Sequence, residues 1–87
     1  VARQFRLFPN PARGEITLQW MAVQGGEAQL LLRDAAGRMV RSWQYDYASG
    51  EQSHKLDLWG LGAGLYQLQV GLDGEQHLLL LLLSGED

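Results

Sequence analysis

Apolar and polar residues alternate in short runs along most of this chain of 87 residues. Successive side chains of a β-strand point to opposite faces, so alternation of period two is typical of a strand with one buried face. Turn residues separate the runs at intervals of roughly 8 to 12 positions, which is the spacing of antiparallel sandwiches. We therefore expect an all-β protein, an antiparallel β-sandwich of about seven strands without a helix.

Strands are expected at residues 4–8, 15–21, 28–33, 38–47, 53–58, 65–72 and 76–83. The second of these places Ile16, Leu18 and Trp20 on one face, which we assign to the core. In the fourth, Val40 and Trp43 lie three positions apart. If both side chains are buried, the alternation must slip between them, as a β-bulge allows.

The last expected strand ends in six consecutive leucines, which are Leu78, Leu79, Leu80, Leu81, Leu82 and Leu83. A membrane-spanning helix needs about 20 apolar residues, so this run is too short to be one. One face of the strand belongs to the core, whereas a monomer rarely exposes an aligned apolar row on the other face. The alternatives for what covers this outer face are a strand of a partner, a second copy of the chain, or the rest of a parent polypeptide.

Both prolines of the chain lie in a short corner between the first two expected strands, at Pro9 and Pro11, with Asn10 between them. Each proline ring fixes φ at about −65° and disfavours helical geometry in the preceding residue, so the corner is rigid and extended. Gly14 follows and supplies a turn conformation that other residues adopt only with strain. We expect this corner to cap the entry to a strand, to be recognised by a partner, or both.

Glycines also mark the expected turns. The segment Asp34-Ala35-Ala36-Gly37 is typical of a type I turn closed by Gly37 in the left-handed region, and Asp73-Gly74 is a strong two-residue hairpin signal. Gly64 and Tyr66 predict a tight turn followed by a buried ring whose hydroxyl binds a backbone group, as in the tyrosine corners of sandwiches.

Composition argues against several classes of function. The net charge is −3 and the seven basic residues are scattered, which disfavours a nucleic-acid partner. The chain has no cysteine, so it can form neither a disulfide nor a thiolate metal site, and His54 and His77 have no arrangement of carboxylates that suggests metal binding. No serine lies in a nucleophile-elbow context and no glycine-rich loop precedes a helix. We therefore expect neither an enzyme nor a cofactor.

Three motifs follow one another in the order found in a known family. They are Phe8-Pro9-Asn10-Pro11 with Gly14, Asp34 to Val40 with the pattern Asp-x-x-Gly-Arg-x-Val, and Leu61 to Tyr66 with the pattern Leu-x-x-Gly-x-Tyr. Each motif alone is weak, but together, in one small β domain, they resemble the type A C-terminal sorting domain of the type IX secretion system. The resemblance covers nearly the whole chain and implies an immunoglobulin-like β-sandwich.

The resemblance also implies that the domain is a secretion signal at the C-terminus of a cargo protein of Gram-negative bacteria. Its partners would be the upstream cargo domain, the outer-membrane secretion machinery, and a sortase-like peptidase that removes the signal and attaches the cargo to the surface. The cargo would pass through the periplasm to the cell surface or the extracellular medium. Members commonly carry Lys or Arg near the C-terminus, whereas this chain ends in Ser84-Gly85-Glu86-Asp87. It is thus either a divergent signal or one recognised through its leucine strand, by pairing with an open sheet edge of the receptor.

The chain begins at Val1 without an initiator methionine or signal segment, so we expect residues 1–87 to be one domain at the end of a longer secreted protein. The candidate recognition residues are Pro9, Asn10, Pro11, Gly14, Gly37, Gly64, Tyr66 and Leu78 to Leu83. The alternative function is an accessory immunoglobulin-like or fibronectin-like module that binds a glycan or supports a domain of a secreted enzyme or adhesin. Trp43, Tyr45 and Tyr47 would be its contact surface, although we favour one buried ring with two half-exposed neighbours.

Overall fold

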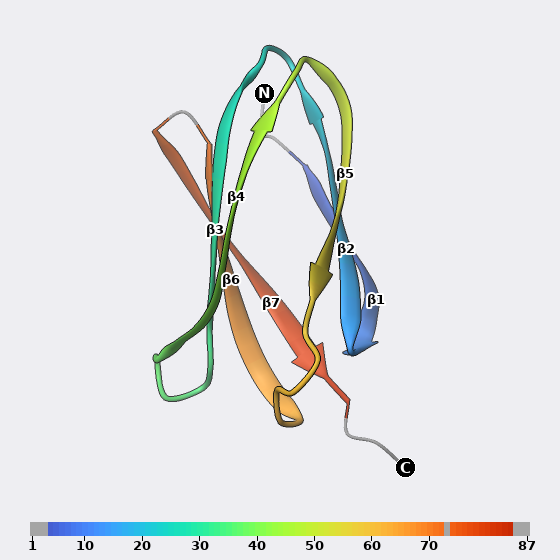
Figure 1. Cartoon of the computed structure of the whole chain (residues 1–87), viewed down its shortest axis with the longest axis vertical. Coiled ribbons are helices and arrows are strands. Elements are labelled where there is room, and N and C mark those ends of the chain that lie inside the picture. The colour runs from blue at the N-terminus through green and yellow to red at the C-terminus, as the bar shows by residue number, and fades with distance from the viewer. Residues whose placement is uncertain (1–3, 73, 85–87) are drawn as a thin grey trace.

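The computed structural model describes residues 4–72 and 74–84, which form seven strands and no helix (Figure 1). The strands are β1 (Phe5–Arg13), β2 (Glu15–Ala22), β3 (Gly26–Arg33), β4 (Met39–Tyr47), β5 (Gly50–Asp57), β6 (Gly64–Leu72) and β7 (Glu75–Leu83). All seven expected strands are confirmed. Asp73 of the hairpin signal, and Gly85, Glu86 and Asp87 of the acidic tail, lie outside the described residues.

The strands form two layers in the order β4-β3-β6-β7-β1-β2-β5, with β1 as the link between them. Figure 1 shows β3, β4, β6 and β7 facing β1, β2 and β5 across the core. Every neighbouring pair is antiparallel except β1 and β7, which are parallel and share the single bridge Ala12↔Leu83. The expected immunoglobulin-like β-sandwich is confirmed.

The first strand extends further than the sequence pattern predicted. We expected it to end at Phe8, but β1 continues to Arg13. Its first half pairs with β2 up to Phe8↔Thr17, and the register is then interrupted until Arg13↔Glu15. Within this interruption Ala12 reaches β7 in the other layer. Proline has no backbone N–H to donate, so the ladder with β2 cannot continue through Pro9 and Pro11. The corner is therefore the place where β1 changes sheets.

The core lies between the inner faces of the two layers and follows the expected alternation. Its buried hydrophobic residues are Ala12, Ile16, Leu18, Trp20, Ala22, Ala28, Leu30, Leu32, Tyr47, Leu56, Leu58, Tyr66, Leu68, Val70, Leu72, Leu81 and Leu83. The expected bulge is confirmed at Val40, because Leu32 pairs with Arg41 and Arg33 pairs with Met39. This extra residue allows both Val40 and Trp43 to pack against the core.

The connection between β4 and β5 is shorter than predicted. The expected strands at 38–47 and 53–58 left residues 48–52 between them, but only Ala48 and Ser49 separate β4 and β5, since β5 begins at Gly50. The reason is that β5 pairs with the whole length of β2, from Glu15↔Asp57 to Ala22↔Gly50. Gly50 has a φ of 112°, which favours glycine at this tight reversal.

Candidate functional site

An apolar row lies on the outer face of β7. We call Leu78, Leu80 and Leu82 the leucine row; their side chains are 64%, 60% and 46% exposed. The leucines between them face inward: Leu79 packs against the core, and Leu81 and Leu83 are buried in it. The structure therefore shows the expected core face and the expected exposed apolar face of this strand. An aligned exposed row of this kind is typical of an interaction surface.

The apolar surface continues onto β6. Leu65 lies directly opposite Leu82 in the β6–β7 ladder and is 50% exposed. Farther along the strand, Leu80 and Leu78 lie opposite Gln67 and Gln69. The apolar strip thus follows β7 and gives way to polar side chains on the next strand. Sequence reasoning did not include Leu65, because a pattern along one strand does not show which residue lies opposite.

Asn10 binds the backbone of β7 through its side-chain amide. Its Nδ2 donates to the Leu80 carbonyl oxygen at 3.3 Å, and its Oδ1 accepts from the Leu82 N–H at 3.0 Å. Two residues after Leu82, just past the end of β7, the Ser84 N–H donates to the Ala12 carbonyl oxygen at 2.8 Å. The amide of Asn10 therefore takes the place that a peptide group of a neighbouring strand would occupy.

The corner that carries Asn10 is itself on the surface. Pro9, Asn10 and Pro11 are exposed, and the peptide bonds before both prolines are cis. Arg6 lies over the Phe8 ring, with its guanidinium carbon 5.5 Å from the ring centroid. Sequence reasoning singled out this corner but not its contacts with β7. An available signal was that an asparagine between two prolines offers both a donor and an acceptor where the adjacent backbone has lost its donors.

Gly14 is required by close packing as well as by its conformation. Its φ is 63°, and a Cβ atom built there would lie 2.6 Å from the indole ring of Trp59. The Gly14 carbonyl oxygen also accepts from the Leu58 N–H at 2.8 Å. Trp59 is held in place by its own backbone, whose N–H donates to Asp57 and whose carbonyl oxygen accepts from Arg41. The sequence pattern identified Gly14 but not its partner Trp59.

A pocket of about 620 Å³ opens beside Trp59, at the end of the sandwich where β1 and β7 end. Its lining includes Arg13, Leu58, Leu61 and Leu83 together with the glycine-rich segment 60–62. The walls are mostly aliphatic, aromatic and backbone atoms. The described residues contain no group of three or more His, Asp or Glu side chains that could hold a metal ion.

The remaining candidate residues have structural partners. Tyr66 is buried, and its hydroxyl donates to the Gly62 carbonyl oxygen at 2.5 Å, which confirms the predicted ring with a backbone partner. Gly64 has a φ of 150° where β6 begins. Gly37 has a φ of 89° and its N–H donates to the Asp34 carbonyl oxygen, which confirms the predicted turn. This turn joins β3 and β4, and in the sheet order β6 lies between β3 and β7, so Gly37 is not part of the surface around the leucine row.

The Asp34 carboxylate holds the β3–β4 turn together. It accepts hydrogen bonds from the backbone N–H groups of Ala36 and Arg38, and from the Arg38 guanidinium. The bond from the Arg38 backbone is the largest influence that lowers the pKa of Asp34, and the Arg38 side chain adds to it. This charge therefore serves the turn and provides no acid–base pair.

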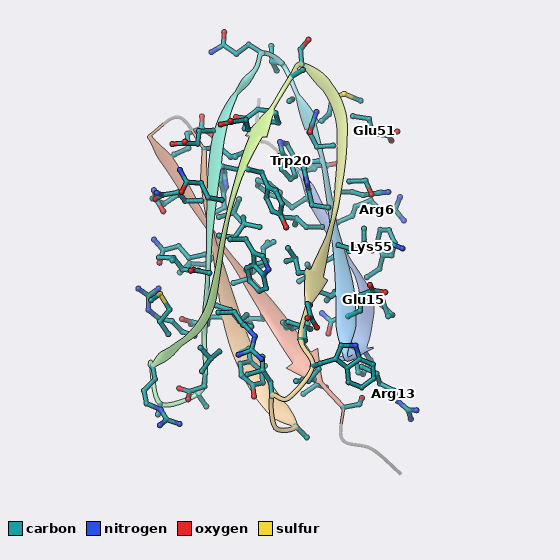
Figure 2. All side chains as sticks on the ribbon, viewed as in Figure 1. Arg6, Arg13, Glu15, Trp20, Glu51 and Lys55 are labelled. Carbon is teal, nitrogen blue, oxygen red and sulfur yellow. The ribbon has the colours of Figure 1, made fainter. Side chains whose placement is uncertain are left out.

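The aromatic residues on β4 face the core rather than solvent. Trp43 and Tyr45 are partly buried against the core, and Tyr47 is buried, as the favoured interpretation predicted. These three rings therefore do not form an exposed platform for a sugar. Figure 2 shows Trp20 between the two layers, where its ring lies 5.6 Å from that of Tyr47.

His54 lies within this aromatic cluster. Its ring stacks on Tyr45 at a centroid distance of 4.4 Å and on Trp20 at 5.2 Å. The His54 Nε2 atom is buried and makes no hydrogen bond within the described part of the chain. Burial lowers the pKa of His54 and raises that of Tyr45. Both histidines serve strand packing, since His77 contacts the Phe5 ring at 4.8 Å.

Comparison with known proteins agrees with the motifs. The sequence model of the family described as secretion system C-terminal sorting domain matches residues 6–79, and no curated protein matches the chain. Among solved structures, the fold is similar to part of dimeric latent PorU from Porphyromonas gingivalis, with a TM-score of 0.76 and 20% identity over 97% of this chain and 9% of that one. In the described residues, no helix is long and apolar enough to cross a membrane. The family match confirms the resemblance, and the chain belongs to the family of C-terminal sorting domains of the type IX secretion system.

Proposed function

We propose that the outer-membrane secretion machinery recognises this sorting domain in its folded state. Through this recognition the domain directs an upstream cargo protein from the periplasm across the outer membrane. The surface that the machinery recognises consists of the leucine row together with the corner at Pro9, Asn10 and Pro11. The observation that supports this proposal most is the exposed apolar row on a strand whose other face packs against the core.

Folding is what creates this surface. In an unfolded chain the six leucines of 78–83 are equivalent, but folding of the sandwich places β7 beside β6 and against the other layer, which buries alternate leucines and leaves the others outside. The same pairing brings Asn10 to the β7 backbone, 70 residues away in sequence from Leu80. A receptor that reads the leucine row and the corner together therefore distinguishes the folded domain from an unfolded tail.

A second step follows transport in the proposed sequence of events. A sortase-like peptidase removes the domain, and the cargo is attached to the cell surface or released. The domain itself contributes no catalytic group to this step. Comparison of the cargo before and after export by mass spectrometry tests this part separately, because cargo that keeps residues 1–87 would contradict removal.

The direct test fuses residues 1–87 to a periplasmic reporter in a type IX-competent host. Reporter outside the outer membrane is expected with the complete domain and lost when residues 78–87 are deleted. A host that lacks the secretion machinery, and a reporter without the domain, serve as controls. Retention of the complete fusion in the periplasm would contradict the proposal.

The need for a folded domain can be tested within the same assay. Leu81 is buried and Leu80 is exposed, although they are neighbours on one strand. Leu81→Asp places a charge in the core and should unfold the domain, and export should be lost with it. Normal export of this unfolded variant would show that the machinery reads linear sequence.

A further inference from the structure

One long edge of β7 faces away from β6 and is only partly covered. The Leu80 carbonyl oxygen and the Leu82 N–H both bind Asn10, so the backbone groups of these residues point away from β6. In a β-strand this direction alternates with period two, as the side chains do. The backbone groups of Gln76 and Leu78 therefore point to the same edge.

Residues of β1 cover this edge only near the C-terminal end of β7. Asn10 reaches Leu80 and Leu82, and Ala12 bridges Leu83, but β1 pairs with β2 in the other layer from Phe5 to Phe8. Among the described residues no ladder partner lies on this side of 76–80. Phe5 and His77 are in contact at 4.8 Å and close the inner side of the gap between β1 and β7.

We infer that this edge accepts one extended strand of the outer-membrane secretion machinery, paired with the edge-facing backbone groups of Gln76 and Leu78. This inference rests on the proposed function and specifies how the surface is read. Strand addition supplies affinity through backbone hydrogen bonds, and alternate side chains supply specificity. On the outer face the added strand lies beside Leu78 and Leu80, so its outward side chains are apolar. Asn10 occupies the edge at Leu80 and Leu82 and therefore limits how far the added strand can extend.

The size of the surface favours a partner over a second copy of the chain. The leucine row and Leu65 are four side chains, each 46–64% exposed, whereas a stable complex buries about 800 Å², or about 20–30 residues, on each partner. Two copies that met only at this edge would bury too little for a stable dimer. A receptor strand held within a larger protein adds contacts beyond the edge, including the exposed corner at 9–11.

Proline and threonine substitutions separate backbone pairing from side-chain contact. Leu78→Pro removes the leucine side chain and the edge N–H, and proline is tolerated where a strand N–H faces solvent. Leu78→Thr removes the same leucine side chain, keeps the N–H and favours a strand. The pair Gln76→Pro and Gln76→Thr repeats the test near the beginning of β7. Thermal unfolding of each purified variant shows whether it is folded.

We expect reporter export to be at least about tenfold lower with each proline variant than with its threonine control, which corresponds to about 1.4 kcal/mol. Equal export for proline and threonine variants, with the unmodified domain exported, would overturn strand addition and leave the proposed function standing. Failure of the unmodified domain to be exported would overturn both. A dimer of the purified chain that Leu78→Pro breaks and Leu78→Thr preserves would assign the edge to a second copy and would also overturn the inference.

Discussion

The two layers of the sandwich have similar inner faces and different outer faces. The outer face of β1, β2 and β5 is mostly polar, and Figure 2 shows Arg6, Glu15, Glu51 and Lys55 projecting from it away from the core. Its exposed apolar side chains, Phe8 and Met21, are isolated and form no row. On the opposite layer, the outer face of β7 carries the leucine row. Both layers bury apolar side chains equally well, so the fold does not require leucines outside. The difference supports the proposal that the outer leucines serve contact with another molecule.

The same comparison applies to single residues of equal exposure. Trp59 is 66% exposed and Leu78 is 64% exposed, but their surroundings differ. The Trp59 ring lies on Gly14, and its backbone is tied to Asp57 and Arg41. We therefore assign Trp59 to structure and Leu78 to recognition. Exposure alone does not identify a recognition surface, and the following variants test this assignment.

The largest effect is expected when the outer face of β7 is made polar. The triple variant Leu78→Thr, Leu80→Thr and Leu82→Thr should lower reporter export by at least about tenfold, or about 1.4 kcal/mol, because the apolar contact is lost. Threonine favours strands, so the unfolding temperature should change little.

Its matched control places three threonines on the other outer face, at Gln19, Glu51 and Lys55. Export of this control should stay within about twofold of the unmodified domain, since surface substitutions away from special features have small effects. Equal loss of export in both triple variants would remove the distinction between the two faces.

The second largest effect is expected at Gly14. Gly14→Ala should lower the free energy of unfolding by about 1–3 kcal/mol, because a side chain meets both an unfavourable φ and the Trp59 ring. Urea unfolding followed by tryptophan fluorescence measures the change. Gly37→Ala is the control, since φ is also positive there but no atom lies within 4 Å of the added Cβ. A loss at Gly14 no larger than at Gly37 would show that the Trp59 contact does not matter.

A smaller effect is expected at Asn10. Asn10→Ala removes two hydrogen bonds to β7 and should lower the free energy of unfolding by about 1 kcal/mol. Amide hydrogen exchange gives a more specific measurement, because the Leu82 N–H should exchange faster in the variant. The Leu81 N–H faces β6 and serves as the internal control. Unchanged protection of Leu82 would contradict the role given to Asn10 as a cover of the edge.

The smallest effect is expected from the titration of His54. Burial lowers its pKa in the folded domain below the ordinary value of 6.5, so the unfolded chain binds more protons once the pH falls below about 6.5. The domain should therefore lose stability as the pH falls from 7.5 to 5.5, by a few degrees of unfolding temperature. His54→Phe keeps a ring between Trp20 and Tyr45 and should reduce this decline. If the unfolding temperature of the variant falls by the same amount, the loss of stability would come from groups other than His54.

Much of the fold could be predicted because local rules decide it. Alternation identified all seven strands and the core face of β2, and the spacing of Val40 and Trp43 predicted the bulge that the structure contains. Gly37 and Tyr66 were predicted by turn and ring chemistry that acts within four residues. These features depend on the chain near each residue, so a single sequence contains the information.

The site was harder to predict because its contacts are distant in sequence. Alternation shows which side chains share a face but not which strand lies alongside, so the passage of β1 from one sheet to the other was missed. The bonds of Asn10 to β7 and the contact of Trp59 with Gly14 likewise join separate parts of the chain. The corner and the leucines were recognised as candidates separately, whereas their contact follows only from the topology.

Site-specific photo-crosslinking during export tests the central claim most directly. A photoreactive amino acid is placed at Leu80, on the apolar outer face, or at Lys55, on the polar one, in the reporter fusion. We predict that position 80 crosslinks to a protein of the outer-membrane secretion machinery and that position 55 gives several-fold less of the same product, because Lys55 lies on the opposite outer face. Equal crosslinking at the two positions, or crosslinking at position 55 alone, would contradict the account.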